Sequence, residues 1–150
     1  KNMTKRIFID DSILCKLFDD NSPVEQAAAR NLIGDVENST IVTSALSLAN
    51  FYEEVTIRFT RSLEPVTAKL AVNDLTELTV VQLDSDLVLA ATEIQTSFGV
   101  SMSEAITVEA ALTSGCDFIV TEVFEKKDSV KGIQIERLKN MITAGESTND

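Results

Sequence analysis

A short apolar run that ends on two adjacent acids places the strongest constraint on how this chain can fold. Ile7-Phe8-Ile9 is followed directly by Asp10 and Asp11. An uninterrupted apolar run of this length is typical of a strand that is buried on both faces. A carboxylate at the end of such a strand must be hydrated, paired or bound to a cation. The role of the two carboxylates is therefore the first functional question.

Apolar runs and helical patterns alternate along the rest of the chain. Further strands are expected at residues 41–43, 79–83, 116–121 and 133–136. The stretches between them predict helices, and each begins at a capping residue or a proline: Ser12, Ser22-Pro23, Ser44, Glu64-Pro65, Asp84 or Ser85, and Ser101. This alternation predicts an α/β fold, a three-layer α/β/α sandwich with a central, mostly parallel sheet of four to five strands.

Length and composition predict one domain with its own core. The chain has 150 residues, of which 44% are hydrophobic, and it contains no repeat or linker. We expect a single domain over residues 1–142 and a disordered polar tail over 143–150. No signal peptide or apolar run near the ~18 residues of a membrane span is present. A cytoplasmic protein without membrane association is expected.

The charge balance narrows the functions that are open to the chain. Its 24 acids and 13 bases give a net charge of −11, and it has no histidine. This balance disfavours long-range attraction of nucleic acid and favours divalent cations or a basic partner. The lack of histidine removes the commonest acid/base catalyst and the usual zinc ligand. Cys15 and Cys116 are expected to be buried, reduced thiols.

Acidic residues follow three of the predicted strands. Asp10 and Asp11 follow the first strand, Asp84 the third and Glu122 the fourth. Sites in a parallel sheet covered by helices form at the carboxyl ends of its strands. Chemistry is therefore expected at this edge.

Four segments, in this order, resemble the PIN-domain family of small metal-dependent ribonucleases, which includes toxins of toxin–antitoxin pairs. They are FIDDSILCKLFDD (8–20), TSALSLANFYEEV (43–55), VSMSEAITVEAAL (100–112) and GCDFIVTEVF (115–124). The resemblance covers about residues 6–136. It implies three or four carboxylates at the sheet edge that hold Mg²⁺ or Mn²⁺ for hydrolysis of RNA.

The family's acidic positions are only partly kept. Asp10 matches the first, Asn50 stands at the second, Glu104 replaces Asp at the third, and Val123 stands at the fourth. The additional methylene of Glu104 moves its carboxylate by about 1 Å, and such a misplacement can lower a rate roughly 10²-fold. The resemblance implies Asp10, Asn50 and Glu104 as catalytic residues, with Asp10 and Glu104 as metal ligands. Glu122 is a candidate replacement for the acid missing at Val123.

Each candidate also has a structural interpretation. Asp10 and Asp11 could cap the helix that follows, and Asn50 could be an ordinary surface residue. Ser101-x-x-Glu104 has the spacing of a capping box. The remaining charged candidates, which are more often solvated, are Glu53, Glu54 and Lys126-Lys127.

Two functions are consistent with these residues. The first is a toxin-like, divalent-metal-dependent ribonuclease with a weakened site and reduced or absent activity. Its expected partners are RNA, a small basic antitoxin-like protein and a second copy of the chain. The alternative is a catalytically inactive PIN-like module for binding or dimerisation. Haloacid dehalogenase phosphatases and response-regulator receivers fit less well, because Ser12 and Glu122-Val123 stand where these need an Asp and a Lys.

Overall fold

Six strands form one sheet in the computed structural model, which describes residues 4–124 and 128–141. In chain order the strands are β1 (Lys5–Ile9), β2 (Ser39–Ser44), β3 (Thr79–Val81), β4 (Phe118–Val120), β5 (Ser129–Val130) and β6 (Ile133–Glu136). Across the sheet the order is β3-β2-β1-β4-β6-β5. All neighbours run parallel except β5, which is antiparallel to β6. The carboxyl ends of β1, β2 and β4 therefore meet at one edge.

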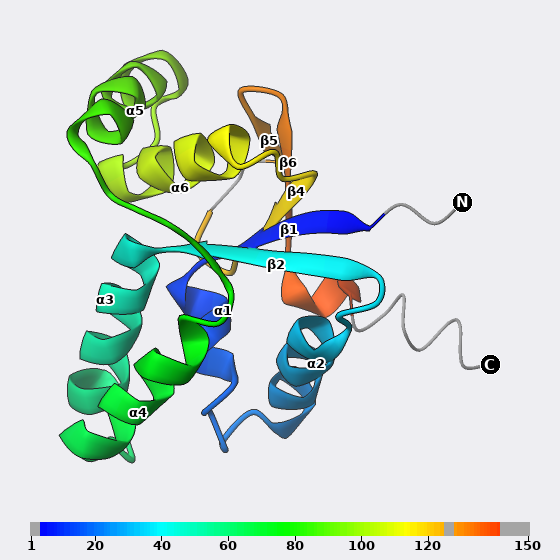
Figure 1. Ribbon diagram of the computed structural model, residues 1–150, viewed down its shortest axis with the longest axis vertical. Coiled ribbons are helices and arrows are strands. Elements are labelled where there is room, and N and C mark those ends of the chain that lie inside the picture. Colours follow the sequence, from blue (N-terminus) through cyan, green and yellow to red (C-terminus); the bar gives the residue numbers. More distant parts are fainter. Residues whose placement is uncertain (1–3, 125–127, 142–150) are drawn as a thin grey trace.

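Helices cover both faces of this sheet (Figure 1). They are α1 (Asp11–Lys16), α2 (Pro23–Gly34), α3 (Ala45–Glu53), the π-helical turn η1 (Glu54–Arg58), α4 (Pro65–Leu75), α5 (Ser85–Phe98) and α6 (Met102–Thr113). Helices α1 to α4 lie on one side, and α5 and α6 lie on the other. The predicted three-layer sandwich is confirmed.

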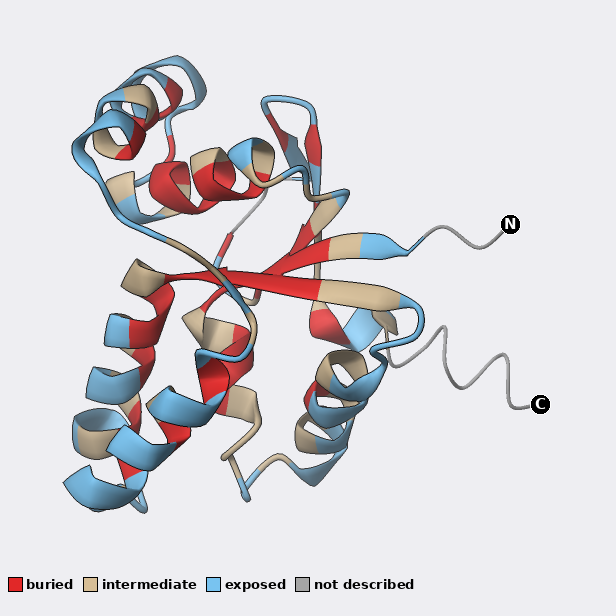
Figure 2. Cartoon of the chain, viewed as in Figure 1, coloured by how far each residue is buried: buried red, intermediate tan, exposed pale blue. Residues whose placement is uncertain are grey.

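The sheet separates two hydrophobic cores, and alternate residues of β1 contribute to each. Phe8 packs with residues of α5 and α6, whereas Ile7 and Ile9 pack with residues of α1, α3 and α4. This follows from the period of two along a strand. Figure 2 shows the buried residues concentrated in the central strands and on the helix faces turned toward them.

Two expectations about the elements need correction. The sheet has six strands rather than four to five, because the two-residue strand β5 was not anticipated. Ser12 is not the cap of the first helix, since Asp10 occupies that position and accepts a hydrogen bond from the Ser12 amide. Ser44, Asp84 and Ser101 cap their helices as predicted, and Gly99 ends α5 with a φ of +68°. Ser22 occupies the N-cap position of α2, but its side chain makes no capping hydrogen bond.

The sequence also led to expectations about the two cysteines, membrane-spanning helices and the C-terminal tail. Cys15 is a buried free thiol and Cys116 is a half-buried one. None of the helices over the described residues is long and apolar enough to cross a membrane. The expected tail and Lys126-Lys127 lie outside the described residues, so the domain limits stay a prediction.

Candidate functional site

Asp10 lies at the carboxyl end of β1 and is almost completely buried, with 3% of its surface exposed. Its Oδ1 accepts hydrogen bonds from the amide (3.0 Å) and the hydroxyl (2.5 Å) of Ser12, and its Oδ2 accepts one from the Thr121 hydroxyl (2.5 Å). Burial raises the pKa of Asp10 to about 6, although both hydroxyl hydrogen bonds act to lower it. The residue therefore caps α1 and also presents a hydrogen-bonded carboxyl group at the sheet edge.

Asp11 and Asn50 are brought together from α1 and α3. Burial raises the pKa of Asp11, a side-chain hydrogen bond from Asn50 lowers it, and the charge of nearby Glu54 raises it. A carboxylate at position 50 would repel Asp11, whereas the amide of Asn50 can donate to it. The acid that the resemblance implies at position 50 is thus absent, and the additional acid at position 11 lies against that position.

Glu104 lies in the first turn of α6, which begins at the end of the sheet where the parallel strands end (Figure 1). Its Oε1 accepts a hydrogen bond from the Ser101 amide (3.0 Å), and its own amide donates to Ser101 Oγ (3.1 Å). The capping box is confirmed. Within the described part of the chain, Oε2 makes no hydrogen bond, so one oxygen of Glu104 is open to another partner.

Glu122 directs its carboxylate toward the C-terminal segment. Its Oε2 accepts a hydrogen bond from the Leu138 amide (2.8 Å), and its own amide donates to Ser12 Oγ (2.9 Å). Val123, the residue at the fourth family position, is 52% exposed. The loop after β4 thus approaches Asp10 with hydroxyl and amide groups.

The other acids have partners outside this cluster. Asp84, which follows β3, accepts a hydrogen bond from the Leu87 amide and so caps α5. Glu53 and Glu54 lie 3.9 Å and 3.3 Å from a guanidinium nitrogen of Arg58. These two acids were expected to be solvated; their side chains are 55% and 39% exposed, and both also pair with Arg58.

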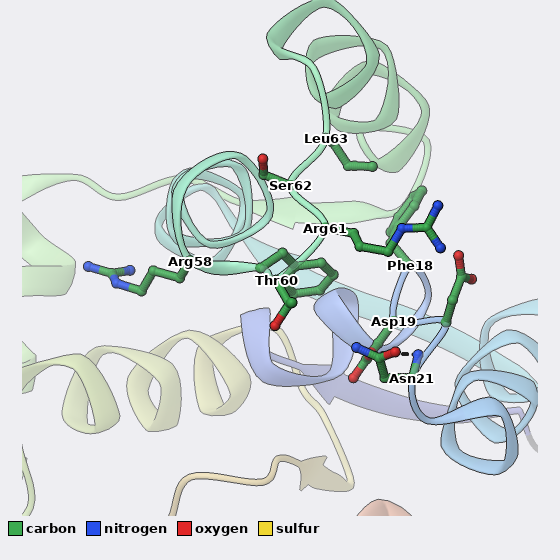
Figure 3. Close-up of a pocket in the computed structure, with 10 residues that line it drawn as sticks. Phe18, Asp19, Asn21, Arg58, Thr60, Arg61, Ser62 and Leu63 are labelled. Carbon is green, nitrogen blue, oxygen red and sulfur yellow. Dashed lines mark hydrogen bonds between the residues drawn. The ribbon is translucent and has the colours of Figure 1, made fainter.

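A pocket of about 410 Å³ lies between residues 18–21 and 58–63 (Figure 3). Figure 3 shows Arg58 and Arg61 extending in opposite directions, while Asp19 accepts a hydrogen bond from the Asn21 amide. The lining carries charges of both signs and includes none of the candidate site residues. We assign the pocket no part in the site.

The sequence matches the family model described as PIN domain over residues 7–122. This chain belongs to the PIN-domain family. No curated protein sequence matches it significantly.

Solved structures share the fold of this PIN domain at low sequence identity. A chain of VapBC2 from Rickettsia felis, bound to a DNA fragment from their promoter, has a TM-score of 0.65 and 14% identity over 88% of this chain and 98% of that chain. VapC20 from Mycobacterium tuberculosis, a Sarcin-Ricin loop cleaving toxin, has a TM-score of 0.62 and 18% identity, covering 81% and 91%. DNA-bound VapBC from Salmonella typhimurium has a TM-score of 0.64 and 15% identity, covering 91% and 99%. These likenesses establish the fold.

The candidate residues of this PIN domain carry donor atoms of the kind that divalent cations bind. Asp10, Glu104 and Asn50 offer carboxylate and amide oxygens, which hard cations prefer. Both oxygens of Asp10 already accept hydroxyl hydrogen bonds. Over residues 4–124 and 128–141, no group of three or more Asp, Glu or Cys side chains is placed to hold a metal ion.

Thr121 is the site residue that sequence reasoning missed. It is fully buried, and its hydroxyl donates directly to Asp10. A usable signal was present, because Thr121 directly follows β4, and β4 pairs with β1, the strand that Asp10 directly follows. A hydroxyl residue at the end of a neighbouring parallel strand is well placed to hydrogen-bond a buried carboxyl group.

Proposed function

We propose that this PIN domain is a toxin-type ribonuclease with a weakened divalent-metal site, so that its hydrolysis of RNA is reduced or absent. The observation that carries the proposal is the buried Asp10, which sits at the family's first acidic position without a complete set of acids around it. Fewer carboxylates bind a cation less tightly and neutralise less charge on the phosphate in the transition state.

In this proposal Asp10 and Glu104 hold Mg²⁺ or Mn²⁺, and Asn50 contributes a neutral oxygen. When bound, the cation activates water and neutralises charge on the RNA phosphodiester. Ser12 and Thr121 fix the orientation of the Asp10 carboxyl group through their hydroxyls. Glu122, also a candidate catalytic residue, contributes to the site through its backbone while its carboxylate holds the Leu138 amide.

Cleavage of several RNAs with Mg²⁺ or Mn²⁺ tests this function. We expect slow cleavage by the wild type that Asp10→Asn removes. Asp84→Asn is the matched control, because it also changes an acid that follows a strand, and Asn remains a good helix cap. The paired substitution Asn50→Glu and Val123→Asp should raise the cleavage rate above that of the wild type by roughly 10²-fold or more, since well-placed charge stabilisation has effects of that size. Cleavage by the wild type as fast as by the restored variant would contradict a weakened site.

The alternative function is a catalytically inactive module for binding or dimerisation, and an apolar groove between α3 and α4 favours it. The groove encloses about 310 Å³ and is lined by Leu48, Ala49, Tyr52, Lys69 and Val72. We propose that a second copy of the chain packs here. Sedimentation velocity of the wild type and of Tyr52→Glu tests this, because Tyr52 lines the groove and is 36% exposed. The variant should be monomeric if the groove is the dimer interface.

We also propose a small basic antitoxin-like partner and a cytoplasmic location. Several solved structures with this fold are VapBC or toxin–antitoxin complexes, and the net charge of −11 complements a basic protein. A small basic protein encoded beside this gene should bind it with an affinity that falls as salt is raised. Binding that is unchanged by salt would argue against a charge-driven partner.

A further inference from the structure

The loop that follows β4, residues 121–124, is tied to the C-terminal segment by a guanidinium group. Nη1 of Arg137 donates to the Thr121 carbonyl at 3.1 Å, and Nη2 donates to the Phe124 carbonyl. Arg137 makes no ion pair with a carboxylate among the described residues. Its planar fork therefore serves the two carbonyl groups, which lie at opposite ends of the loop.

Two further hydrogen bonds attach the same loop to the same segment. The Thr121 amide donates to the Glu136 carbonyl at 2.9 Å, which continues the pairing of β4 with β6. Glu122 Oε2 accepts from the Leu138 amide at 2.8 Å, and Leu138 is fully buried. The loop is thus held at its start, its middle and its end by residues 136–138.

This attachment bears on Asp10 because Thr121 holds one of its two oxygens. The Thr121 hydroxyl donates to Asp10 Oδ2, and the Glu122 amide donates to the Ser12 hydroxyl that holds Oδ1. Both hydroxyls around the buried carboxyl group are therefore placed by the loop. A shift of the loop would change the orientation of the carboxyl group without any change in Asp10 itself.

We propose that Arg137 is a positioning residue for Asp10, acting through Thr121 and the 121–124 loop. The part of the proposal that concerns metal affinity rests on the proposed function, since it takes Asp10 as the metal-binding acid. The C-terminal segment then belongs to the site, although it lies outside the span matched by the family model and contributes no ligand. Residues that orient metal ligands commonly change metal affinity about 10- to 100-fold when replaced.

The first test follows the hydroxyl proton of Thr121 by NMR in Arg137→Met. Because this hydroxyl is buried and hydrogen-bonded, its proton should be visible in the wild type and should exchange with water about tenfold faster in the variant. The amides of β1 should keep their protection, which separates repositioning from general unfolding. Arg30→Met is the matched control, because Arg30 also donates to a carbonyl, that of Leu17, away from the loop.

Arg137→Lys decides the matter if the Met variant does not fold. A lysine ammonium can reach one carbonyl but cannot match the fork of a guanidinium, so the Thr121 hydroxyl should still exchange faster in Arg137→Lys than in the wild type. A folded variant of either kind with wild-type exchange of the Thr121 hydroxyl overturns the proposal.

Mn²⁺ titration of the same variants tests the link to function. We expect affinity to fall about 10- to 100-fold in Arg137→Met and to be unchanged in Arg30→Met. A wild type that binds no Mn²⁺ would contradict the proposed function, while the hydroxyl measurement would still decide the positioning role. Unchanged Mn²⁺ affinity in Arg137→Met beside faster hydroxyl exchange would overturn the functional link alone.

Discussion

Burial of the Asp10 carboxyl group opposes its ionisation, and this has a direct effect on stability. The pKa of Asp10 is raised from 3.8 to about 6 by burial. Between these values the folded protein binds more protons at this group than the unfolded chain does. The free energy of unfolding therefore decreases as the pH rises through this range. The stabilising contribution is fully present below about pH 4 and is lost as the pH rises through about 6.

We predict that Asp10→Asn removes this part of the pH dependence. The difference between 3.8 and about 6 corresponds to roughly 3 kcal/mol of unfolding free energy. In metal-free buffer at pH 8, the free energy of unfolding of the variant should equal or exceed that of the wild type. Near pH 4 this advantage should be lost. Urea denaturation at a series of pH values measures the difference. A difference in unfolding free energy between the two proteins that does not change with pH would contradict the raised pKa of Asp10.

The contact between Asp11 and Asn50 predicts that an added carboxylate at position 50 lowers the stability of the protein. Asn50→Asp replaces a hydrogen-bond donor to Asp11 with a second carboxylate, so we expect a loss of roughly 1–3 kcal/mol of stability without metal. Adding Asp11→Ser should recover most of it, because the like charge is then gone. Thermal unfolding measures both.

Asn73→Asp is the control for this pair. Asn73 is an exposed residue on α4, and the same change there should alter stability by no more than about 0.5 kcal/mol. Equal effects at positions 50 and 73 would show that the contact with Asp11 carries no energy.

At the scale of a single element, two substitutions in the first turn of α6 can separate the two roles of Glu104, helix capping and metal binding. Glu104→Gln keeps a capping box, since glutamine also accepts at this position, but removes the charge. We predict unchanged stability and weaker Mn²⁺ binding. Ser101→Ala should do the reverse and lower stability by about 1 kcal/mol through loss of the cap. Chemical denaturation measures the stability of both variants, and calorimetric titration measures their affinity for Mn²⁺. If Mn²⁺ binding were unchanged in Glu104→Gln, the role of Glu104 would be purely structural.

Most elements could be predicted from the sequence because their signals are local. The apolar run of β1 and the glycine that ends α5 each indicate the local conformation within a few consecutive residues. Strand β5 could not be predicted, since its two residues gain their conformation from pairing with β6.

The candidate site was predictable in position but not in its contacts. The carboxyl ends of parallel strands located Asp10 correctly at the edge of the sheet. The contact between Asp11 and Asn50 joins two different helices, and the clamp of Arg137 on Thr121 joins segments that the sequence pattern treats as independent. Such contacts depend on how whole elements pack, and no local pattern encodes them.

For the molecule as a whole, the excess of negative charge predicts a response to salt. Lys16 and Arg58 pair with four acids, and the net charge of −11 leaves acids in large excess. Raising the salt concentration from 0.01 M to 1 M shortens the screening length from about 30 Å to about 3 Å and should weaken this self-repulsion. We predict a higher urea midpoint in NaCl.

A variant with less charge provides the comparison. Asp74→Lys and Glu77→Lys change two exposed acids near the end of α4. Each substitution removes one negative charge and adds one positive charge, so the net charge changes from −11 to −7. The midpoint of this variant should rise less with NaCl. An equal rise in both proteins would assign the effect to general salting-out.

The place of β1 between β2 and β4 has a consequence for the order of folding. One edge of β1 pairs with β2, which follows soon after it, but the other pairs with β4, which is made only after α6. As the chain leaves the ribosome, that second edge stays open until residues 118–120 emerge. An unpaired apolar strand in a nascent chain can attach to other exposed strands. This chain should therefore depend on chaperones, or on rapid completion of synthesis, more than a fold built from neighbouring hairpins.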